Sequence, residues 1–205
     1  MAVDFRTAKA DSEPTWEIAY LFPSQGAWSE PEYLGLQTNR CVEYSDGNLE
    51  VLAMPGERHQ RIVLFLLQLL AVHVHSLRLG TVLMAPFPVR LWPGKFREPD
   101  IVFLHADHDD RRHEQYWDGA DLVIEVVSPD DPNRDLVTKR DEYARAGIAE
   151  YWIVDRRPRT ITVLTLEDGS YRVHGVFAAG ERAQSVLLAE FSVAVAEVFA
   201  DSDSR

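Results

Sequence analysis

The chain has 205 residues, enough for one hydrophobic core, and its hydrophobic share of 46% and charged share of 26% are ordinary for a globular protein. Cys41 is the single cysteine, which excludes an intramolecular disulfide and favours a reducing compartment such as the cytoplasm. The formal net charge of -12 argues against a protein that coats nucleic acid through its overall field, but not against an enzyme that reaches a phosphodiester through a divalent cation.

The two ends of the chain are polar and irregular. We expect residues 1–28 to be an N-terminal extension, residues 29–200 to form one domain and residues 201–205 to be a polar tail. The first sixteen residues contain five charged side chains and no apolar run, so a secretory signal is not expected. The longest apolar stretch, residues 62–72, is shorter than the roughly 20 residues that cross a bilayer.

Hydrophobic periodicity and turn residues predict the secondary structure. The clearest element is a long helix after Pro55-Gly56, with a narrow polar stripe of Arg61, Gln68 and His75 on an otherwise buried surface. Residues 105–117 are too polar for the core and predict a surface excursion. In chain order we expect a helix at 31–37, a hairpin of strands 41–45 and 49–54, the long helix at 57–79, strands at 81–85, 89–92, 100–104 and 121–127, a helix at 135–146, a strand at 151–155, a hairpin of strands 160–166 and 171–177, and a helix near 193–200.

The middle of the chain determines the predicted fold class. A strand at 121–127, a helix at 135–146 and a strand at 151–155 imply a right-handed parallel crossover. The hairpins on either side add antiparallel strands to it. We therefore expect an α/β fold with a mixed sheet, a parallel centre and helices packed against it.

A carboxylate interrupts the most apolar predicted strand, Asp-Leu-Val-Ile-Glu-Val-Val over residues 121–127. Because side chains alternate along a strand, Glu125 shares a face with Val123 and Val127. An ionised carboxylate on such a face is costly to desolvate unless a cation or strong donors compensate it. The ordinary structural alternative is a glutamate near the open end of the strand that pairs with an arginine.

Two further polar residues flank this strand in the predicted topology. Asp100 opens the strand at 100–104 directly after Pro99, which fixes where the chain enters the sheet. Lys139 lies on the next helix, whose inner face passes above the carboxyl end of the Glu125 strand if the helix packs on the sheet. Each residue also has a common structural explanation. Asp100 could cap a turn, and Lys139 could form a surface salt bridge to Asp135.

Together, Asp100, Glu125 and Lys139 predict a catalytic site. Two carboxylates from neighbouring strands supply the hard oxygen ligands that Mg²⁺ or Mn²⁺ prefers. The metal polarises a phosphate oxygen and lowers the pKa of a bound water, and a nearby ammonium stabilises the charge of the transition state. We therefore expect a metal-dependent, nuclease-type site that uses water as the nucleophile. Together with the family resemblance given next, these residues lead us to expect an endonuclease that acts on nucleic acid, with DNA favoured.

The order of these motifs resembles the Uma-two family, bacterial restriction-endonuclease-like proteins within the PD-(D/E)XK nuclease superfamily. The likeness runs over residues 30–200 in the same order and spacing. It rests on Glu-Tyr-Ser-Asp-Gly at 43–47, Arg-His-Gln-Arg-Ile at 58–62, Glu-Pro-Asp at 98–100, Asp-Leu-Val-Ile-Glu-Val-Val-Ser-Pro at 121–129, Lys139, Tyr-Ala-Arg-Ala-Gly at 143–147 and Glu-Tyr-Trp-Ile-Val-Asp at 150–155.

The resemblance implies a restriction-endonuclease-like core with a long first helix and a βαβ crossover. It implies that Asp100 and Glu125 are metal ligands, that Glu43 is a further acidic ligand and that Lys139 is the catalytic lysine. The superfamily's usual lysine position, two residues after the glutamate, holds Val127 in this chain. Lys139 would therefore act from the following helix instead. A homodimer is compatible with the resemblance and has no other support.

Four other positions bear on the site. His59 starts the long helix, where it could approach the site beside a helix end that favours anions, although a surface histidine is equally common there. Tyr143 lies one turn after Lys139 and could orient its ammonium or simply pack. In the family pattern, a small hydroxyl residue is usual at the position of Asp130 and an acid is common at the position of Asn48. Both departures could alter the hydrogen bonds around the proposed metal ligands.

Other clusters carry weaker signals. The histidines and aspartates of residues 105–113 lack zinc-ligand spacing, and His73 and His75 are two apart on a helix and cannot chelate together. Two rival functions stay open, a catalytically silent binding or regulatory module, which the acidic charge favours, and a carboxylate hydrolase of another substrate class. A group of arginines after the site could bind phosphate or be solvated: Arg134, Arg140, Arg145, Arg156, Arg157 and Arg159.

Overall fold

The computed structural model describes residues 22–38, 40–129 and 131–203, with side chains to residue 200. Most of the expected N-terminal extension, and Asp130, lie outside the described residues. The part of the extension that is described lies along the first hairpin, where the side-chain amide of Gln25 accepts from the backbone N–H of Leu49 at 2.7 Å and donates to its carbonyl at 2.9 Å.

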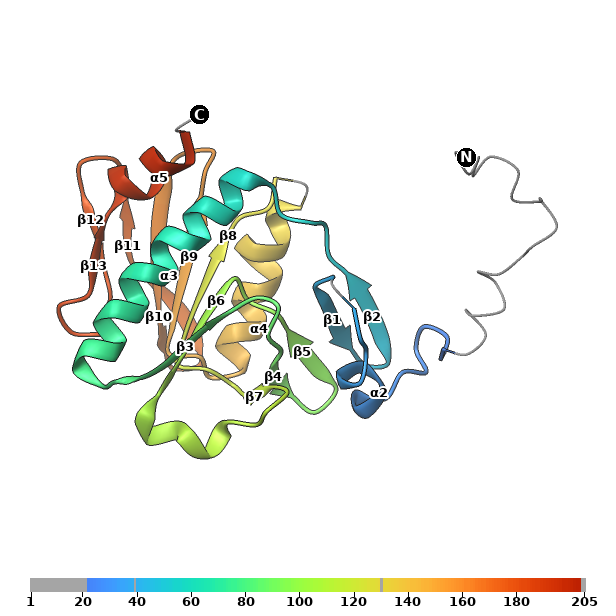
Figure 1. Cartoon of the computed structure of the whole chain (residues 1–205). Helices are drawn as coiled ribbons and strands as arrows, with labels where there is room; N and C mark the ends of the chain where they lie inside the picture. The colour runs from blue at the N-terminus through green and yellow to red at the C-terminus, as the bar shows by residue number, and fades with distance from the viewer. Residues whose placement is uncertain (1–21, 39, 130, 204–205) are drawn as a thin grey trace, which may run out of the picture.

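A six-stranded mixed sheet forms the centre of the molecule, in the order β11-β10-β9-β8-β6-β3 (Figure 1). Strands β8 and β9 run parallel, and the other neighbouring strands of this sheet are antiparallel. This confirms the predicted mixed sheet with a parallel centre. Its strands are β3 (Gly80–Met84), β6 (Ile101–His105), β8 (Leu122–Val126), β9 (Glu150–Asp155), β10 (Thr160–Glu167) and β11 (Ser170–Phe177).

The expectation of one sheet is wrong, because the first hairpin belongs to a second sheet in the order β2-β1-β5-β4-β7. Four strands were not predicted, β5, β7 and the separate pair β12–β13, because runs of two or three residues are too short to show an alternation. The elements outside the central sheet are α2 (Glu30–Leu34), β1 (Val42–Ser45), β2 (Asn48–Val51), β4 (Val89–Trp92), β5 (Lys95–Arg97), β7 (Trp117–Asp118), β12 (Arg182–Gln184) and β13 (Ser192–Ala194).

Helices cover both faces of the central sheet (Figure 1). On one face, α3 (Glu57–Leu77) and α5 (Val195–Asp203) share a buried cluster with Leu122, Ile124 and Val126 of β8. On the other face, Val123 and Val127 share a cluster with Tyr143 of α4 (Lys139–Arg145) and with residues of β4 and β7. Glu125 points to this second face, as the alternation predicts.

The long helix α3 is buried on one face only, which corrects the prediction of a narrow polar stripe on a buried helix. Its buried side chains are those of Ile62, Val63, Leu66, Leu70 and Val74, whereas Val72 on the opposite side is 70% exposed. By length and composition alone α3 could also cross a membrane. That indication is weak, because core helices and signal sequences pass the same test.

Three other boundaries differ from the prediction. The helix expected at 135–146 begins as a π-helical turn, η3 (Arg134–Thr138), before α4 continues it, and such turns occur often at functional sites. The polar excursion contains the 3₁₀ helix η2 (Ala106–Arg111) but ends before Trp117, which is buried in the core. Helix α5 extends to Asp203, inside the predicted polar tail.

Glu150, at the start of β9, holds the C-terminal part of the chain against the sheet. Its carboxylate is 1% exposed and accepts four hydrogen bonds of 2.6 to 2.8 Å. The donors are Trp152 Nε1, Ser185 Oγ and the backbone N–H groups of Val186 and Leu187. An acceptor-only group is needed here, because every neighbour donates.

We expect Glu150→Gln to lower the free energy of unfolding by about 2–4 kcal/mol, because its NH₂ group cannot accept from the backbone donors and leaves them unpaired. Urea unfolding followed by circular dichroism measures this loss. The matched control is Glu167→Gln, since Glu167 is exposed on β10 and pairs with Arg172. It should change stability by less than about 0.5 kcal/mol. Equal losses of stability in the two variants would show that Glu150 does not hold the C-terminal part of the chain against the sheet.

Candidate active site

The carboxylates of Asp100 and Glu125 come from neighbouring antiparallel strands. The register of β6 and β8 pairs Ile101 with Ile124, which places Asp100 opposite Glu125 at the next position. The side chain of Asp100 also accepts a hydrogen bond from the backbone N–H of Val126 at 2.7 Å. Both carboxylates line a cavity of about 580 Å³. The structure therefore brings together the two acids that the sequence singled out.

Glu125 is buried, with 3% of its surface exposed. Its Oε1 accepts hydrogen bonds from Lys139 Nζ at 2.8 Å and from Tyr143 OH at 2.6 Å, and the expected alternative of an arginine partner is not what the structure shows. Burial raises the pKa of Glu125 above its ordinary value of 4.5, and the charges of Asp100 and Asp135 raise it further, against the opposing effect of Lys139. The ionised form of Glu125 is therefore disfavoured in this environment, mainly because the side chain is buried.

Lys139 lies at the centre of several acids. Its Nζ is 2.8 Å from Glu125, 3.2 Å from Asp135 and 3.8 Å from Glu43. Burial alone would lower the pKa of Lys139, but these carboxylates raise it above the usual lysine value. The expected salt bridge between Lys139 and Asp135 is present, but both side chains are buried, so it is not a surface pair. Tyr143 does not orient the ammonium directly, because its hydroxyl donates to the same oxygen of Glu125 that Lys139 binds.

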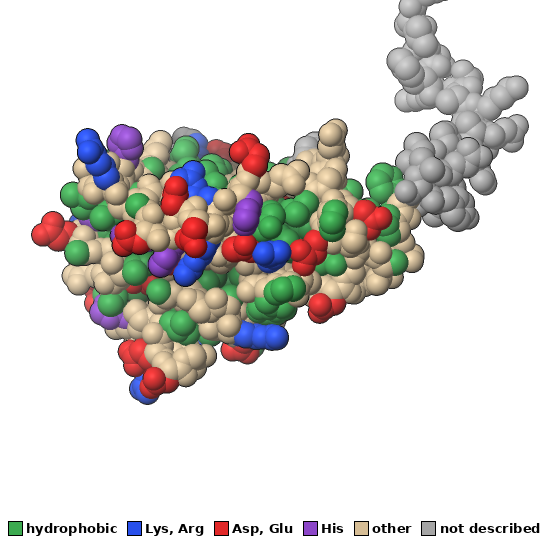
Figure 2. Space-filling model, turned by 90° about the horizontal axis from the view of Figure 1, so that it is seen from below, with side chains coloured by type: hydrophobic (Ala, Val, Ile, Leu, Met, Phe, Trp, Pro, Cys, Tyr) green, Lys and Arg blue, Asp and Glu red, His purple; other side chains and the backbone are tan. Residues whose placement is uncertain are grey.

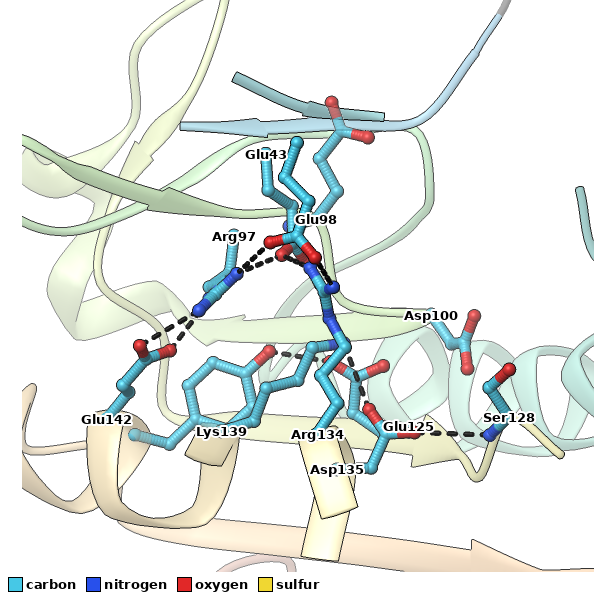
Figure 3. A network of polar contacts seen from close by, with 12 residues as sticks. Glu43, Arg97, Glu98, Asp100, Glu125, Ser128, Arg134, Asp135, Lys139 and Glu142 are labelled. Carbon is cyan, nitrogen blue, oxygen red and sulfur yellow. Dashed lines mark hydrogen bonds and ion pairs between the residues drawn. The ribbon is translucent and has the colours of Figure 1, made fainter. Parts of the chain in front are cut away.

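Glu43 of β1 lies on the far side of Lys139 and is engaged by arginines (Figure 3). Its carboxylate forms ion pairs with Arg97 and Arg134 and accepts from the backbone N–H of Glu98 at 3.3 Å. Burial favours its neutral form, but Lys139, Arg97 and Arg134 outweigh burial and lower the pKa of Glu43 to about 2. Glu43 does not line the cavity, so its predicted role as a metal ligand would require Arg134 to release it.

The ion-pair network continues away from the cavity and contains residues that the sequence did not single out. Arg97 forms a two-point contact with Glu142 at 2.7 and 2.9 Å, and Lys95 binds the same carboxylate at 2.8 Å. Burial, followed by the charge of Glu43, raises the pKa of Glu98 to about 7. No local signal marked these residues, because a charged, apolar, charged run of three residues is ordinary for a half-exposed strand, whereas in the structure Lys95 and Arg97 are buried like Phe96.

His59 reaches the site from the first turn of α3. Its Nε2 lies 3.1 Å from Oδ2 of Asp100, and its Nδ1 is buried without a hydrogen-bond partner among the described residues. Burial works against protonation, but the hydrogen bond to Asp100 and the nearby charge of Glu125 raise the pKa of His59. The proposed approach of His59 to the site is therefore what the structure shows.

The arginines after the site divide into two groups. Arg134 and Arg156 line the cavity. The others contact groups elsewhere: Arg140 donates to the carbonyl of Tyr171, Arg145 lies over the ring of Trp92, Arg157 pairs with Asp155 and Arg159 lies over the ring of Phe199. The histidines of the polar excursion likewise form separate pairs, His108 with Asp121 and His113 with Asp118.

The donor set fits a hard divalent cation. Within the described part of the chain, no group of three His, Cys, Asp or Glu side chains has the geometry of a metal site. Mg²⁺ commonly uses one or two carboxylates and fills its shell with waters and substrate phosphates, so Asp100 and Glu125 can suffice. Burial and the neighbouring charges of Asp100 and Asp135 disfavour the ionised form of Glu125, and a divalent cation at the cavity would favour it.

Comparisons with known proteins bear on the family and the fold. The model of the Uma2 family, described as "Putative restriction endonuclease", matches residues 30–196. The crystal structure of a protein titled a "putative nuclease" from Anabaena variabilis superposes with a TM-score of 0.70 at 18% identity, covering 88% of this chain and 99% of that one. This likeness shows a shared fold. Among curated proteins, none matches.

Proposed function

The chain belongs to the Uma2 family, described as "Putative restriction endonuclease", and from this membership we propose a Mg²⁺- or Mn²⁺-dependent endonuclease that hydrolyses phosphodiester bonds of DNA. One observation carries the proposal. The half-buried carboxylate of Asp100 and the buried carboxylate of Glu125 lie opposite each other on neighbouring strands at a common cavity, with the Lys139 ammonium 2.8 Å from Glu125. Carboxylate pairs of this kind bind hard cations, and an adjacent ammonium can stabilise a phosphate transition state.

Each side chain has a distinct part in the proposed reaction. Asp100 and Glu125 would hold the cation, which polarises the phosphate and activates a water when bound. Tyr143 fixes the rotamer of Glu125 through its 2.6 Å hydrogen bond. The raised pKa of Lys139 keeps it protonated at neutral pH, so it would stabilise charge on the phosphate rather than accept a proton from water.

The distribution of charge favours recognition inside the cavity over recognition by the whole surface. Acidic and basic side chains are interspersed on the face shown in Figure 2, with no continuous basic patch. The net charge of -12 repels a polyanion at long range. Attraction for the backbone would then come from the cation and from Arg134 and Arg156 in the cavity.

A second candidate function is a catalytically silent nuclease-fold protein that acts as a binding or regulatory module. The observation that favours it is the closed ion-pair network around Glu43, whose carboxylate is already bound by Arg97 and Arg134. Buried networks of this kind also occur for purely structural reasons. The two functions differ in one measurable property, hydrolysis that depends on a divalent cation.

The test is nicking of supercoiled plasmid, with single-stranded DNA and RNA in parallel, in Mg²⁺ or Mn²⁺ and in EDTA. Asp100→Asn is expected to lower the cleavage rate by a factor of about 100 or more, because it removes a charged ligand of the cation. The matched control is Asp131→Asn, since Asp131 lines the same cavity but is exposed and lies outside the strand pair. Its rate should stay within about twofold of the parent rate.

Other outcomes separate the candidates. The same residual cleavage in the parent and in Asp100→Asn would identify a contaminating nuclease. No cleavage by the parent, together with no heat of Mg²⁺ or Mn²⁺ binding by calorimetry, would reject the enzyme and leave the binding module.

A further inference from the structure

Unpaired donors gather around the main cavity. In the part of the chain that the structure describes, four buried side-chain nitrogens have no hydrogen-bond partner, and one of them, His73 Nε2, is elsewhere. The other three belong to residues that line the cavity: His59 Nδ1, Arg134 Nε and Arg156 Nε. A desolvated donor without an acceptor is costly, so native proteins seldom keep one without a reason. These three donors therefore lack hydrogen-bond acceptors, and a ligand in the cavity could supply them.

Arg156 stands out among these three residues. It follows the last residue of β9, and its guanidinium forms no hydrogen bond or ion pair with the described residues. Its neighbour Arg157, by contrast, pairs with Asp155 at 2.6 Å, and Arg134 pairs with Glu43 and Glu50. In a chain with this excess of acids, an unpaired arginine at a cavity is available for an anion from outside the protein.

Arg156 also lies where two cavities meet. A second cavity of about 250 Å³ is lined by Arg58, Arg156 and Arg157, with Asp155 among its other residues. Pro129 and Arg156 line both cavities. Arg58, which lines the second cavity, directly precedes His59, whose Nε2 lies 3.1 Å from Asp100, so the two cavities meet on the Asp100 side of the main cavity. An anionic chain leaving the carboxylate pair in this direction would pass Arg156.

We infer that Arg156 binds the phosphate next to the scissile one, and that the substrate is a nucleic-acid strand whose backbone runs from the Asp100–Glu125 pair into the second cavity. The inference rests on the proposed function. A guanidinium suits this task, because its planar donors match two oxygens of one phosphate. A substrate with a single phosphodiester would leave Arg156 without its ligand.

The test compares substrates with one and with several phosphodiesters. Values of kcat/KM are measured for the parent, Arg156→Gln and Arg172→Gln on a single-stranded DNA oligonucleotide and on bis(p-nitrophenyl) phosphate. Arg172 is the control because it is an exposed arginine on β11 that pairs with Glu167, and its replacement changes the charge equally. Arg156→Gln should lose about tenfold more on the oligonucleotide than on the small diester. The salt dependence of its oligonucleotide KM should also become shallower by about 0.7 in log–log slope.

Partial rescue of oligonucleotide cleavage by Arg156→Lys would support a phosphate contact, because lysine keeps the charge. Equal losses of Arg156→Gln on both substrates, or no loss beyond that of Arg172→Gln, would overturn the inference while leaving the nuclease intact.

If the parent cleaves neither substrate, anisotropy of the labelled oligonucleotide in Ca²⁺ decides the matter. Weaker binding by Arg156→Gln than by Arg172→Gln would support the phosphate contact even though hydrolysis had failed. Binding that is equal in the two variants, or absent in the parent, would overturn it.

Discussion

Lys139→Met is expected to abolish cleavage and to lower the free energy of unfolding by about 3–5 kcal/mol. The ammonium is buried and lies 2.8 Å from Glu125, 3.2 Å from Asp135 and 3.8 Å from Glu43. Methionine fills a similar volume but leaves these carboxylates without the cation that they share. Urea unfolding at pH 7 measures the stability, and plasmid nicking in Mg²⁺ measures the activity.

The matched control for this variant is the adjacent residue. Arg140 donates a single 3.3 Å hydrogen bond to the carbonyl of Tyr171, so Arg140→Met should cost less than about 1 kcal/mol. The double variant Lys139→Met/Glu125→Gln should recover part of the lost stability, because it also removes one of the unpaired charges, but it should recover no cleavage. A Lys139→Met protein as stable as the parent would show that the acids do not depend on this lysine.

Glu125→Gln is expected to lower the activity and, without metal, to raise the stability of the protein. Cleavage should fall by about a thousandfold or more, because the amide is a poor ligand for a hard cation. The metal-free protein should nevertheless become more stable at pH 7, by at least about 1 kcal/mol, because burial disfavours the ionised form of Glu125. Thermal unfolding in EDTA and plasmid nicking in Mg²⁺ measure the two effects.

The difference in stability between Glu125→Gln and the parent should depend on pH. A carboxyl whose pKa is raised in the folded protein contributes its full stability below the ordinary value of 4.5 and loses it as pH rises through the folded pKa. The stability advantage of Glu125→Gln over the parent should therefore be larger at pH 8 than at pH 5. Both proteins contain the same other titrating groups, and of these His59 also feels the charge of Glu125, so the difference between the two proteins reports Glu125 together with its effect on His59. An advantage that shrinks as pH rises would contradict the assigned environment.

Added Mg²⁺ should reverse the order of stability. The cation binds only the folded parent, which stabilises it by mass action, whereas the glutamine variant has lost a ligand. The same thermal scans repeated in Mg²⁺ provide the measurement.

Local signals in the sequence were enough to predict the central strand and the position of Glu125 in it. The apolar, β-branched run around Glu125 required a buried strand, and alternation placed Glu125 on the same face as Val123 and Val127. The position of Asp100 after Pro99 and the helix containing Lys139 followed from local signals in the same way. These features could be predicted because strand alternation and helix boundaries depend on residues that are close in the sequence.

Local signals could not predict which charged side chains come into contact. Glu43 and Arg134 are 91 positions apart, and Glu43 and Arg97 are 54 apart, so no local periodicity could show that both arginines bind this glutamate. The same holds for Arg156, which forms no ion pair with the residues that the structure describes, whereas Arg157 next to it pairs with Asp155. Electrostatic partners are set by distances in space, and these exist only once the two sheets and α4 have packed together.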